Sequence, residues 1–182
     1  MIPLTIPPEI LRPGTVLLVH RRSWLGALIR WVTWSDWNHS ALIEGALHGD
    51  QVLLIEAHDL EGVKHCTIEG YTEDPAVRGL AVYEWPGLTI AQIQAICECA
   101  EAHNGMPYDT LQLVGIYLRA RLPWVGKTRN RLDRADRMIC SELVGRAYLA
   151  AGINLCPPGV GIGCLSPGHL AQTMRMIWEG WR

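Results

Sequence analysis

Short apolar runs separated by turn-forming residues dominate the first half of the chain. Such runs, rich in β-branched and aliphatic side chains and bounded by Gly, Pro, Asn or Asp, are typical of β-strands. The pattern predicts strands over residues 14–20, 39–46, 51–58, 63–68 and 80–85. The second and third of these flank a Leu-His-Gly-Asp tetrapeptide at residues 47–50, so we predict that they form a hairpin.

Elsewhere, hydrophobic residues recur at the spacing of an amphipathic helix. Ser23 is a suitable N-cap for a short helix that ends near Trp34, and Thr89 is a suitable N-cap for a longer helix that stops before Gly105 and Pro107. The apolar stripe of the first helix consists of Trp24, Ala27, Leu28 and Trp31, and that of the second consists of Ile90, Ile93, Cys97 and Ala100.

The last third of the chain contains a further apolar stripe, which begins at Cys140 and is closed by Gly152. Before this stripe we predict a helix over residues 108–121 and an exposed, arginine-rich segment over residues 119–137. A Gly/Pro-rich loop over residues 156–168 and a short terminal helix with Trp178 and Trp181 complete the chain. The stripe consists of Cys140, Leu143, Val144, Ala147, Tyr148 and Ala151.

Strands that come first, followed by a helix that carries a thiol, predict an α+β fold in which an antiparallel sheet packs against helices. The chain has 182 residues, and 49% of them are hydrophobic. This is enough apolar material for one substantial core, and no linker divides it. We therefore predict a single domain over residues 1–182.

Composition and charge narrow the cellular context. The chain starts without a basic, then apolar, export signal, and it lacks the run of about 18 apolar residues that a membrane span requires, so we expect a cytoplasmic protein. We expect its cysteines to be reduced. There is no Cys-x-x-Cys pair, so we predict neither a metal site nor a cofactor. The net charge of −2 argues against a nucleic-acid partner, and peripheral contact with lipid is left open.

The predicted hairpin allows a test of which side chains share a face of the sheet. If the turn centres on residues 48–49, Ala41 pairs with Glu56. His39 then becomes a diagonal neighbour of Glu56 on the same face, at a Cα–Cα distance of about 7–8 Å. That distance suits a hydrogen bond between an imidazole and a carboxylate. A turn longer by one residue would place the two side chains on opposite faces.

Cys140, His39 and Glu56 together provide the three groups that covalent acyl transfer needs. A thiol at a helix N-terminus, next to an imidazolium, is shifted toward thiolate. We predict that Cys140 is the nucleophile, that His39 is the general base and acid, and that Glu56 orients the ring of His39. The backbone amide of Cys140 and the side chain of Tyr108 are the predicted donors to the oxyanion.

Each of these residues also has a simpler interpretation. Cys140 lies on the apolar stripe of its helix, where a buried and inert thiol is common. His58 has the same strand parity as Glu56 and is a rival base. Trp37 is a candidate for substrate binding, but tryptophans are more often part of a core, and the same holds for its three neighbours Trp24, Trp31 and Trp34.

The order His39, Glu56, Cys140 resembles that of the circularly permuted branch of the NlpC-type papain-like cysteine hydrolases, the YiiX-like group. The resemblance extends from Gly14 to about Gly152. The segments that carry it are Pro13-Gly14-Thr15-Val16-Leu17-Leu18, Asn38-His39-Ser40-Ala41-Leu42-Ile43, Ile55-Glu56-Ala57, Pro107-Tyr108-Asp109 and Ile139-Cys140-Ser141-Glu142-Leu143-Val144. Gly14-Thr15 stands where the group has Gly-Asp, and Ala41-Leu42 stands where it has Val-Gly.

The resemblance implies a permuted papain-like fold and an enzyme that cleaves an amide, ester or thioester through an acyl-enzyme at Cys140. The acyl substrate expected from it is a small molecule, a peptide or a lipid-like compound. Two alternatives stay open. One is an acyltransferase that moves an acyl group between lipids, and the other is a binding or structural module that has kept the fold and lost turnover.

Overall fold

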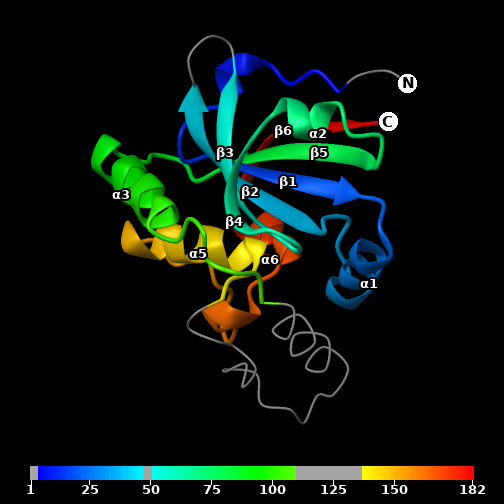
Figure 1. Cartoon of the computed structure of the whole chain (residues 1–182). Coiled ribbons are helices and arrows are strands. Elements are labelled where there is room, and N and C mark those ends of the chain that lie inside the picture. Colours follow the sequence, from blue (N-terminus) through cyan, green and yellow to red (C-terminus); the bar gives the residue numbers. More distant parts are fainter. Residues whose placement is uncertain (1–3, 47–50, 110–136) are drawn as a thin grey trace.

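The computed structural model describes residues 4–46, 51–109 and 137–182. Its centre is a six-stranded sheet with the order β4-β3-β2-β1-β5-β6, in which all neighbouring strands are antiparallel (Figure 1). The strands are β1 (Val16–Arg21), β2 (His39–Ala46), β3 (Val52–His58), β4 (Gly62–Thr67), β5 (Val77–Glu84) and β6 (Arg175–Trp181). The predicted α+β fold is confirmed.

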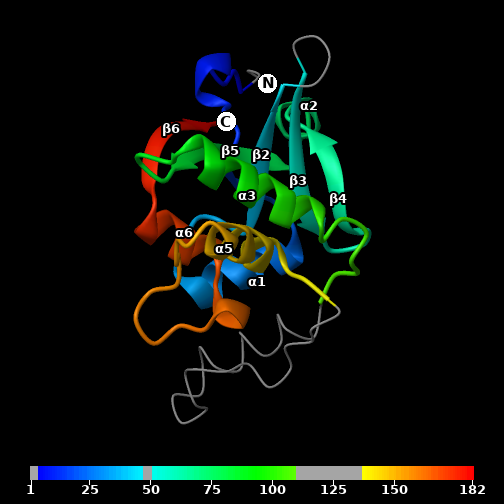
Figure 2. The same ribbon diagram turned by 90° about the vertical axis from the view of Figure 1, so that its left-hand side faces the viewer.

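Helices cover this sheet unequally. Figure 2 shows α3 and α5 side by side over one face of the sheet, with α6 next to α5. The short α2 follows β4, and α1 connects β1 to β2 at one end of the sheet. The helices are α1 (Trp24–Thr33), α2 (Glu69–Thr72), α3 (Ile90–Glu101), α5 (Cys140–Ala150) and α6 (Pro167–Thr173), with 3-10 turns η1 (Pro8–Ile10) and η2 (Ile162–Cys164).

Both faces of the central strands are buried, and β1 illustrates why. Successive side chains of a strand point to opposite faces. Val16 and Leu18 pack in the cluster that includes residues of α3 and α5, whereas Leu17 and Val19 pack in a second cluster with the N-terminal segment and α2. A strand buried on both faces needs apolar residues at every position, which explains the unbroken apolar run in the sequence.

The register of the β2–β3 hairpin confirms one prediction and adds a feature to it. Ala41 pairs with Glu56, as predicted, but nearer the turn Ala46 pairs with Val52, which is a register one residue apart. A β-bulge at Glu44 absorbs the difference. Therefore both the bulge and the turn determine that His39 and Glu56 lie on the same face of the sheet.

The C-terminal segment corrects a prediction. The prediction of a terminal helix that carries Trp178 and Trp181 is wrong. This segment is the edge strand β6, which pairs with β5. A register shift in that pairing disturbs the alternation of the strand, and Gly79 leaves room for the Trp181 ring. The helix that does form near the C-terminus is α6, which Ser166 caps.

Three predictions fall wholly or partly outside the described residues. They concern the turn at residues 47–50, the helix at residues 108–121 and the arginine-rich segment at residues 119–137. Among the helices within the described part of the chain, none is long and apolar enough to span a membrane.

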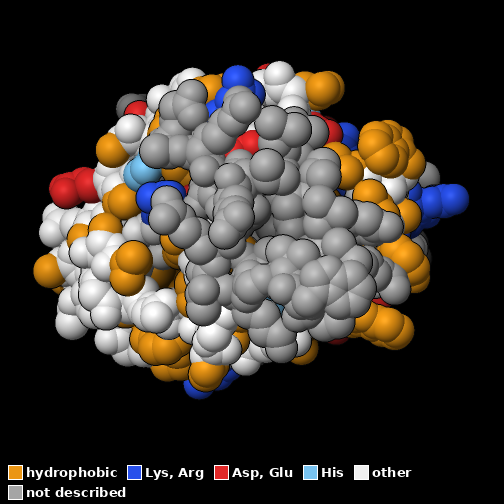
Figure 3. All heavy atoms as spheres, turned by 90° about the horizontal axis from the view of Figure 1, so that it is seen from below, with side chains coloured by type: hydrophobic (Ala, Val, Ile, Leu, Met, Phe, Trp, Pro, Cys, Tyr) orange, Lys and Arg blue, Asp and Glu red, His pale blue; other side chains and the backbone are white. Residues whose placement is uncertain are grey.

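The tryptophans of α1 do not follow the expectation that they form part of a core. Trp24, Trp31 and Trp34 are 81%, 53% and 88% exposed. Figure 3 shows hydrophobic side chains gathered on the side of the molecule where Figure 1 places α1. Trp37, by contrast, is buried, so the core expectation holds for Trp37 and is wrong for the other three.

Candidate active site

Helix α5 carries Cys140 as its first residue. Just before it, Met138 pairs with Tyr108 in an isolated bridge, and the helix packs against β2 and β3. The N-cap residue Ile139 provides no side-chain cap, unlike Ser23 in α1. The sulfur therefore lies at a helix start whose N-cap side chain does not occupy the first backbone amides.

His39, the first residue of β2, lies between a carboxylate and the thiol. Its Nε2 atom is 2.5 Å from Oε2 of Glu56 and 3.1 Å from the hydroxyl oxygen of Tyr71. The ring also interacts with the Cys140 side chain, and this interaction raises the pKa of His39. Because Nε2 faces Glu56 and Tyr71, Nδ1 is the nitrogen left for the sulfur. The bulge at Glu44 gives His39 the strand parity that this arrangement requires.

Glu56 is held in place by a residue that the sequence did not indicate. The Tyr71 hydroxyl donates a hydrogen bond to Oε2 of Glu56, and the Lys64 ammonium lies 4.0 Å from the other carboxylate oxygen. Glu56 is almost completely buried. Tyr71 comes from α2, a single helical turn whose apolar residues show no period that would have drawn attention to it.

The electrostatics favour an ion pair between the thiol and the imidazole. Although burial opposes ionisation of both groups, the mutual attraction of Cys140 and His39, with help from Glu56, raises the pKa of His39 to about 10 and lowers that of Cys140. Burial also opposes ionisation of Glu56, but hydrogen bonds from His39 and Tyr71 lower its pKa to about 2. These directions together stabilise a thiolate, an imidazolium and a carboxylate.

The other cysteines behave in the opposite way. All six cysteines are free thiols. Burial raises the pKa of Cys66 to about 12 and that of Cys97 to about 11, and it also raises the pKa values of Cys99 and Cys156. A thiolate at neutral pH is thus favoured at Cys140 and disfavoured at these four positions.

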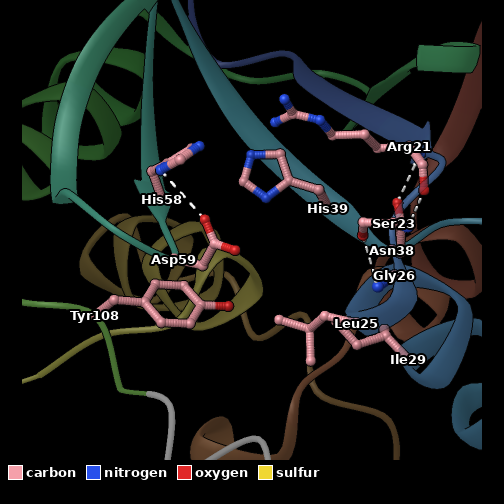
Figure 4. Close-up of a pocket in the computed structure, with 10 residues that line it drawn as sticks. All are labelled: Arg21, Ser23, Leu25, Gly26, Ile29, Asn38, His39, His58, Asp59 and Tyr108. Carbon is pink, nitrogen blue, oxygen red and sulfur yellow. Dashed lines mark hydrogen bonds and ion pairs between the residues drawn. The ribbon is translucent and has the colours of Figure 1, made fainter. Parts of the chain in front are cut away.

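A pocket opens next to His39 between the end of the sheet and α1 (Figure 4). The hydroxyl group of Tyr108 points into it, and Leu25 and Ile29 of α1 form the opposite wall. Cys140, the first residue of α5, is 5% exposed and is not among the described residues that line this pocket. The described residues that line it are Arg21, Ser23, Leu25, Gly26, Ile29, Asn38, His39, His58, Asp59 and Tyr108.

Two of the residues weighed from the sequence take different positions. His58 lines the pocket, but its Nδ1 is 3.3 Å from Oδ1 of Asp59, and His39 is the imidazole that lowers the pKa of the Cys140 thiol. Trp37 does not line the pocket. It is buried in the core cluster that also contains Cys140, and its ring stacks on that of Trp181 at a centroid distance of 5.3 Å.

Asn38, another residue that the sequence did not single out, bonds to the end of β1 and packs against α1. Its side chain accepts a hydrogen bond from the backbone N–H of Arg21 at 2.9 Å and donates one to the carbonyl of Arg21 at 2.7 Å. Gly26 of α1 lies directly against this amide. A Cβ atom on Gly26 would be 1.9 Å from Nδ2 of Asn38.

Replacing Gly26 with alanine should therefore destabilise the protein. The added methyl group must displace Asn38 or tilt α1, and overpacking of this kind costs about 1–3 kcal/mol. Chemical denaturation measures the free energy of unfolding. The matched control is Gly70→Ala in α2, where the added Cβ has open space and the change should be close to neutral. Equal stability of the two variants would contradict the packing described for α1.

A second group of ionisable side chains lies apart from the triad residues in sequence and structure. Nε2 of His65 is 3.0 Å from a carboxylate oxygen of Glu44 and 2.9 Å from one of Glu101. The three residues come from the bulge of β2, from β4 and from the end of α3, and their ligand atoms lie within 4.8 Å of one another. Two carboxylates and an imidazole are suitable ligands for a divalent transition metal. The expectation that the protein has no metal site stays a prediction.

The antiparallel sheet, with a helix that starts at a buried thiol and packs against the strands of an imidazole and a carboxylate, defines a permuted papain-like enzyme. The family of permuted papain-like amidases known as C92, with YaeF and YiiX, matches residues 10–114. The chain belongs to this family. The match includes His39, Glu56 and Tyr108 and ends before Cys140.

A solved structure supports the fold over nearly the whole chain. The crystal structure of the metalloprotein YiiX from Escherichia coli O157:H7 matches with a TM-score of 0.65 and 19% sequence identity, covering 94% of this chain and 98% of that one. No curated protein matches the chain. The YiiX-like part of the predicted resemblance is confirmed, whereas the relation to NlpC-type hydrolases stays a prediction.

Proposed function

We propose that this protein is a thiol-dependent hydrolase that cleaves an amide, ester or thioester bond through an acyl-enzyme at Cys140. The observation that carries the proposal is the contact of His39 with Glu56 on one side and with the thiol on the other. This is the arrangement of nucleophile, base and orienting group on which acyl transfer depends. Membership of an amidase family supports the same reaction class.

The proposed reaction begins from the ion pair. The Cys140 thiolate attacks the substrate carbonyl and forms a C–S bond, while the π electrons of the carbonyl move to its oxygen. When the tetrahedral intermediate collapses, the imidazolium of His39 donates its proton to the leaving group. Neutral His39 then takes a proton from water, which attacks the thioester and releases the acid and the thiolate.

We infer two donors that stabilise the oxyanion. One is the backbone N–H of Cys140, at a helix start without a side-chain cap. The other is the hydroxyl of Tyr108, which points into the pocket. Burial, together with the nearby Cys140 sulfur, raises the pKa of Tyr108 well above its ordinary value, so this hydroxyl stays protonated and can donate.

The pocket wall favours an acyl substrate with an apolar part. Leu25 and Ile29 of α1 face His39 across the pocket, where a fatty acyl chain or an apolar side chain would bury its surface. A lipid acyltransferase is the second candidate, because a lysolipid or an amine could replace water in the last step. Addition of such an acceptor should then divert the acyl group away from the free acid.

The first experimental test is selective labelling of the thiols with iodoacetamide near pH 7, with mass-spectrometric readout. Cys140 should react at least about tenfold faster than the other cysteines, because it is the thiol whose pKa is lowered. His39→Ala should remove this advantage, since the imidazolium supports the thiolate. Uniform labelling in the wild-type protein would contradict the proposal and would favour a module without turnover. A screen of amide, ester and thioester compounds then identifies the bond that is cleaved.

A further inference from the structure

We propose that α1 docks the protein on the surface of an anionic lipid bilayer, with its tryptophans inserted among the headgroups. Trp24 and Trp31 lie on one outward stripe of the helix, and Trp34 follows directly at its C-cap. Gly26 and Val32 are the buried positions. Large contiguous apolar patches are uncommon on a surface that meets only water.

The backbone conformation of Trp34 also supports a role for its exposed ring in binding. It has φ +51°, and it is the one non-glycine residue with a positive φ among those that the structure describes. The left-handed C-cap position is usually occupied by glycine or asparagine, and a bulky residue there costs free energy. The ring of Trp34 recovers little of this cost by packing within the protein, since it is 88% exposed.

The charges around α1 complement an anionic surface. Residues 21–38 contain three arginines, Arg21, Arg22 and Arg30, and one acidic residue, Asp36, although the whole chain has a net charge of −2. Outside this segment, Asp74 forms an ion pair with Arg21. Arg22 is exposed. Basic side chains beside tryptophans on a helix are typical of helices that lie in the membrane interface.

Tryptophan is also the side chain that this location favours. Its ring is apolar and its indole N–H is polar, so it prefers the headgroup region to water or to hydrocarbon. A second copy of the chain would instead need a complementary apolar surface and would face a like-charged helix. We therefore assign the bilayer as the partner and treat self-association as an outcome of the test.

Helix α1 lies next to the pocket, so docking through α1 would bring the pocket close to the membrane. One side of α1 carries Trp24 and Trp31, and another side, with Leu25 and Ile29, forms the wall of the pocket at His39. A bilayer bound to α1 would place the pocket at the lipid surface. The inference that the acyl substrate is carried by a membrane lipid rests on the proposed function, whereas the docking itself does not.

The test is co-sedimentation of the full chain with vesicles of phosphatidylcholine and phosphatidylglycerol, compared with vesicles of phosphatidylcholine alone. The wild-type protein should bind the anionic vesicles more tightly. The double variant Trp24→Ser/Trp31→Ser should lose at least about tenfold in affinity, because two interfacial rings are removed. Arg22→Glu should weaken binding to the anionic vesicles only. The matched control is Ile90→Ser, which removes an equally exposed apolar side chain at the start of α3 and should bind as the wild type does.

Two results would overturn the docking proposal. One is absence of vesicle binding by the wild-type protein, and the other is undiminished binding by the double variant. A dimer that the double variant dissociates, without vesicle binding, would assign the face to self-association. Circular dichroism and unchanged labelling of Cys140 show that the variant is folded.

The catalytic proposal fails separately from the docking proposal. Cys140→Ala should bind vesicles as the wild type does, because Cys140 lies on α5 and not on α1. If vesicles are bound but Cys140→Ala retains turnover, the proposed function is wrong and the docking stands. If turnover of soluble substrates depends on Cys140 but no vesicle is bound, the docking is wrong and the proposed function stands.

Discussion

Replacement of Cys140 with alanine should abolish turnover of the substrate that the screen identifies. We expect kcat to fall by at least about 10³-fold, because the variant lacks the thiol that forms the proposed covalent intermediate and the loss of a nucleophile has effects of this size. The fold should persist, since the change removes one sulfur atom at the start of α5. Kinetics under saturating substrate measure the effect, and intact mass spectrometry should detect an acyl-enzyme in the wild type alone.

The control for this experiment is Cys156→Ala. Cys156 is a partly exposed thiol in the loop after α5, and burial raises its pKa, so its removal should leave kcat unchanged. Turnover that survives in Cys140→Ala would refute the thiol mechanism. The carboxylate and imidazole would then have to act on water directly.

Glu56→Gln should narrow the pH range of activity from its alkaline side. In the wild type, the ion pair exists above the lowered pKa of Cys140 and below the raised pKa of His39 of about 10. Without the carboxylate the imidazolium is less stable, so the pKa of His39 falls and the alkaline limb of kcat/KM moves to lower pH. At the acid limb the imidazolium of His39 is still protonated and keeps its charge beside Cys140, so this limb should not move to higher pH.

The magnitude of this change should be large, because Glu56 is buried and bonded to His39 and Tyr71. We expect kcat/KM at neutral pH to fall about 10- to 10³-fold, as a mispositioned base does. Profiles of kcat/KM from about pH 5 to 11 measure both limbs, and alkylation of Cys140 reports the acid limb alone.

Tyr71→Phe is the graded comparison for Glu56→Gln. It removes one hydrogen bond to Glu56 and leaves the charge, so the alkaline limb should move in the same direction but by less. An unchanged profile in Glu56→Gln would show that the carboxylate has only a structural role. A larger shift in Tyr71→Phe than in Glu56→Gln would contradict the arrangement in which Tyr71 acts through Glu56.

The parts of the site that could be predicted from the sequence are those set by local patterns. Strand parity related His39 to Glu56, and helical spacing placed Cys140 at a helix start. Both rules depend on neighbours within one element or one hairpin. The parity argument succeeded although the bulge at Glu44 was not foreseen, since a bulge inserts a residue without leaving a strong sequence signal.

The sequence by itself therefore determined the element types of most segments and the residues with the chemistry of a thiol hydrolase. The tertiary structure alone decided that Tyr71 supports Glu56, that Asn38 bonds to Arg21 and packs on Gly26 of α1, and that the C-terminal segment is an edge strand. It also decided which tryptophans are buried, since Trp37 stacks on Trp181 whereas the apolar stripe of α1 faces outward. Spacing shows that a helix has an apolar side, but only the placement of distant segments decides whether anything covers it.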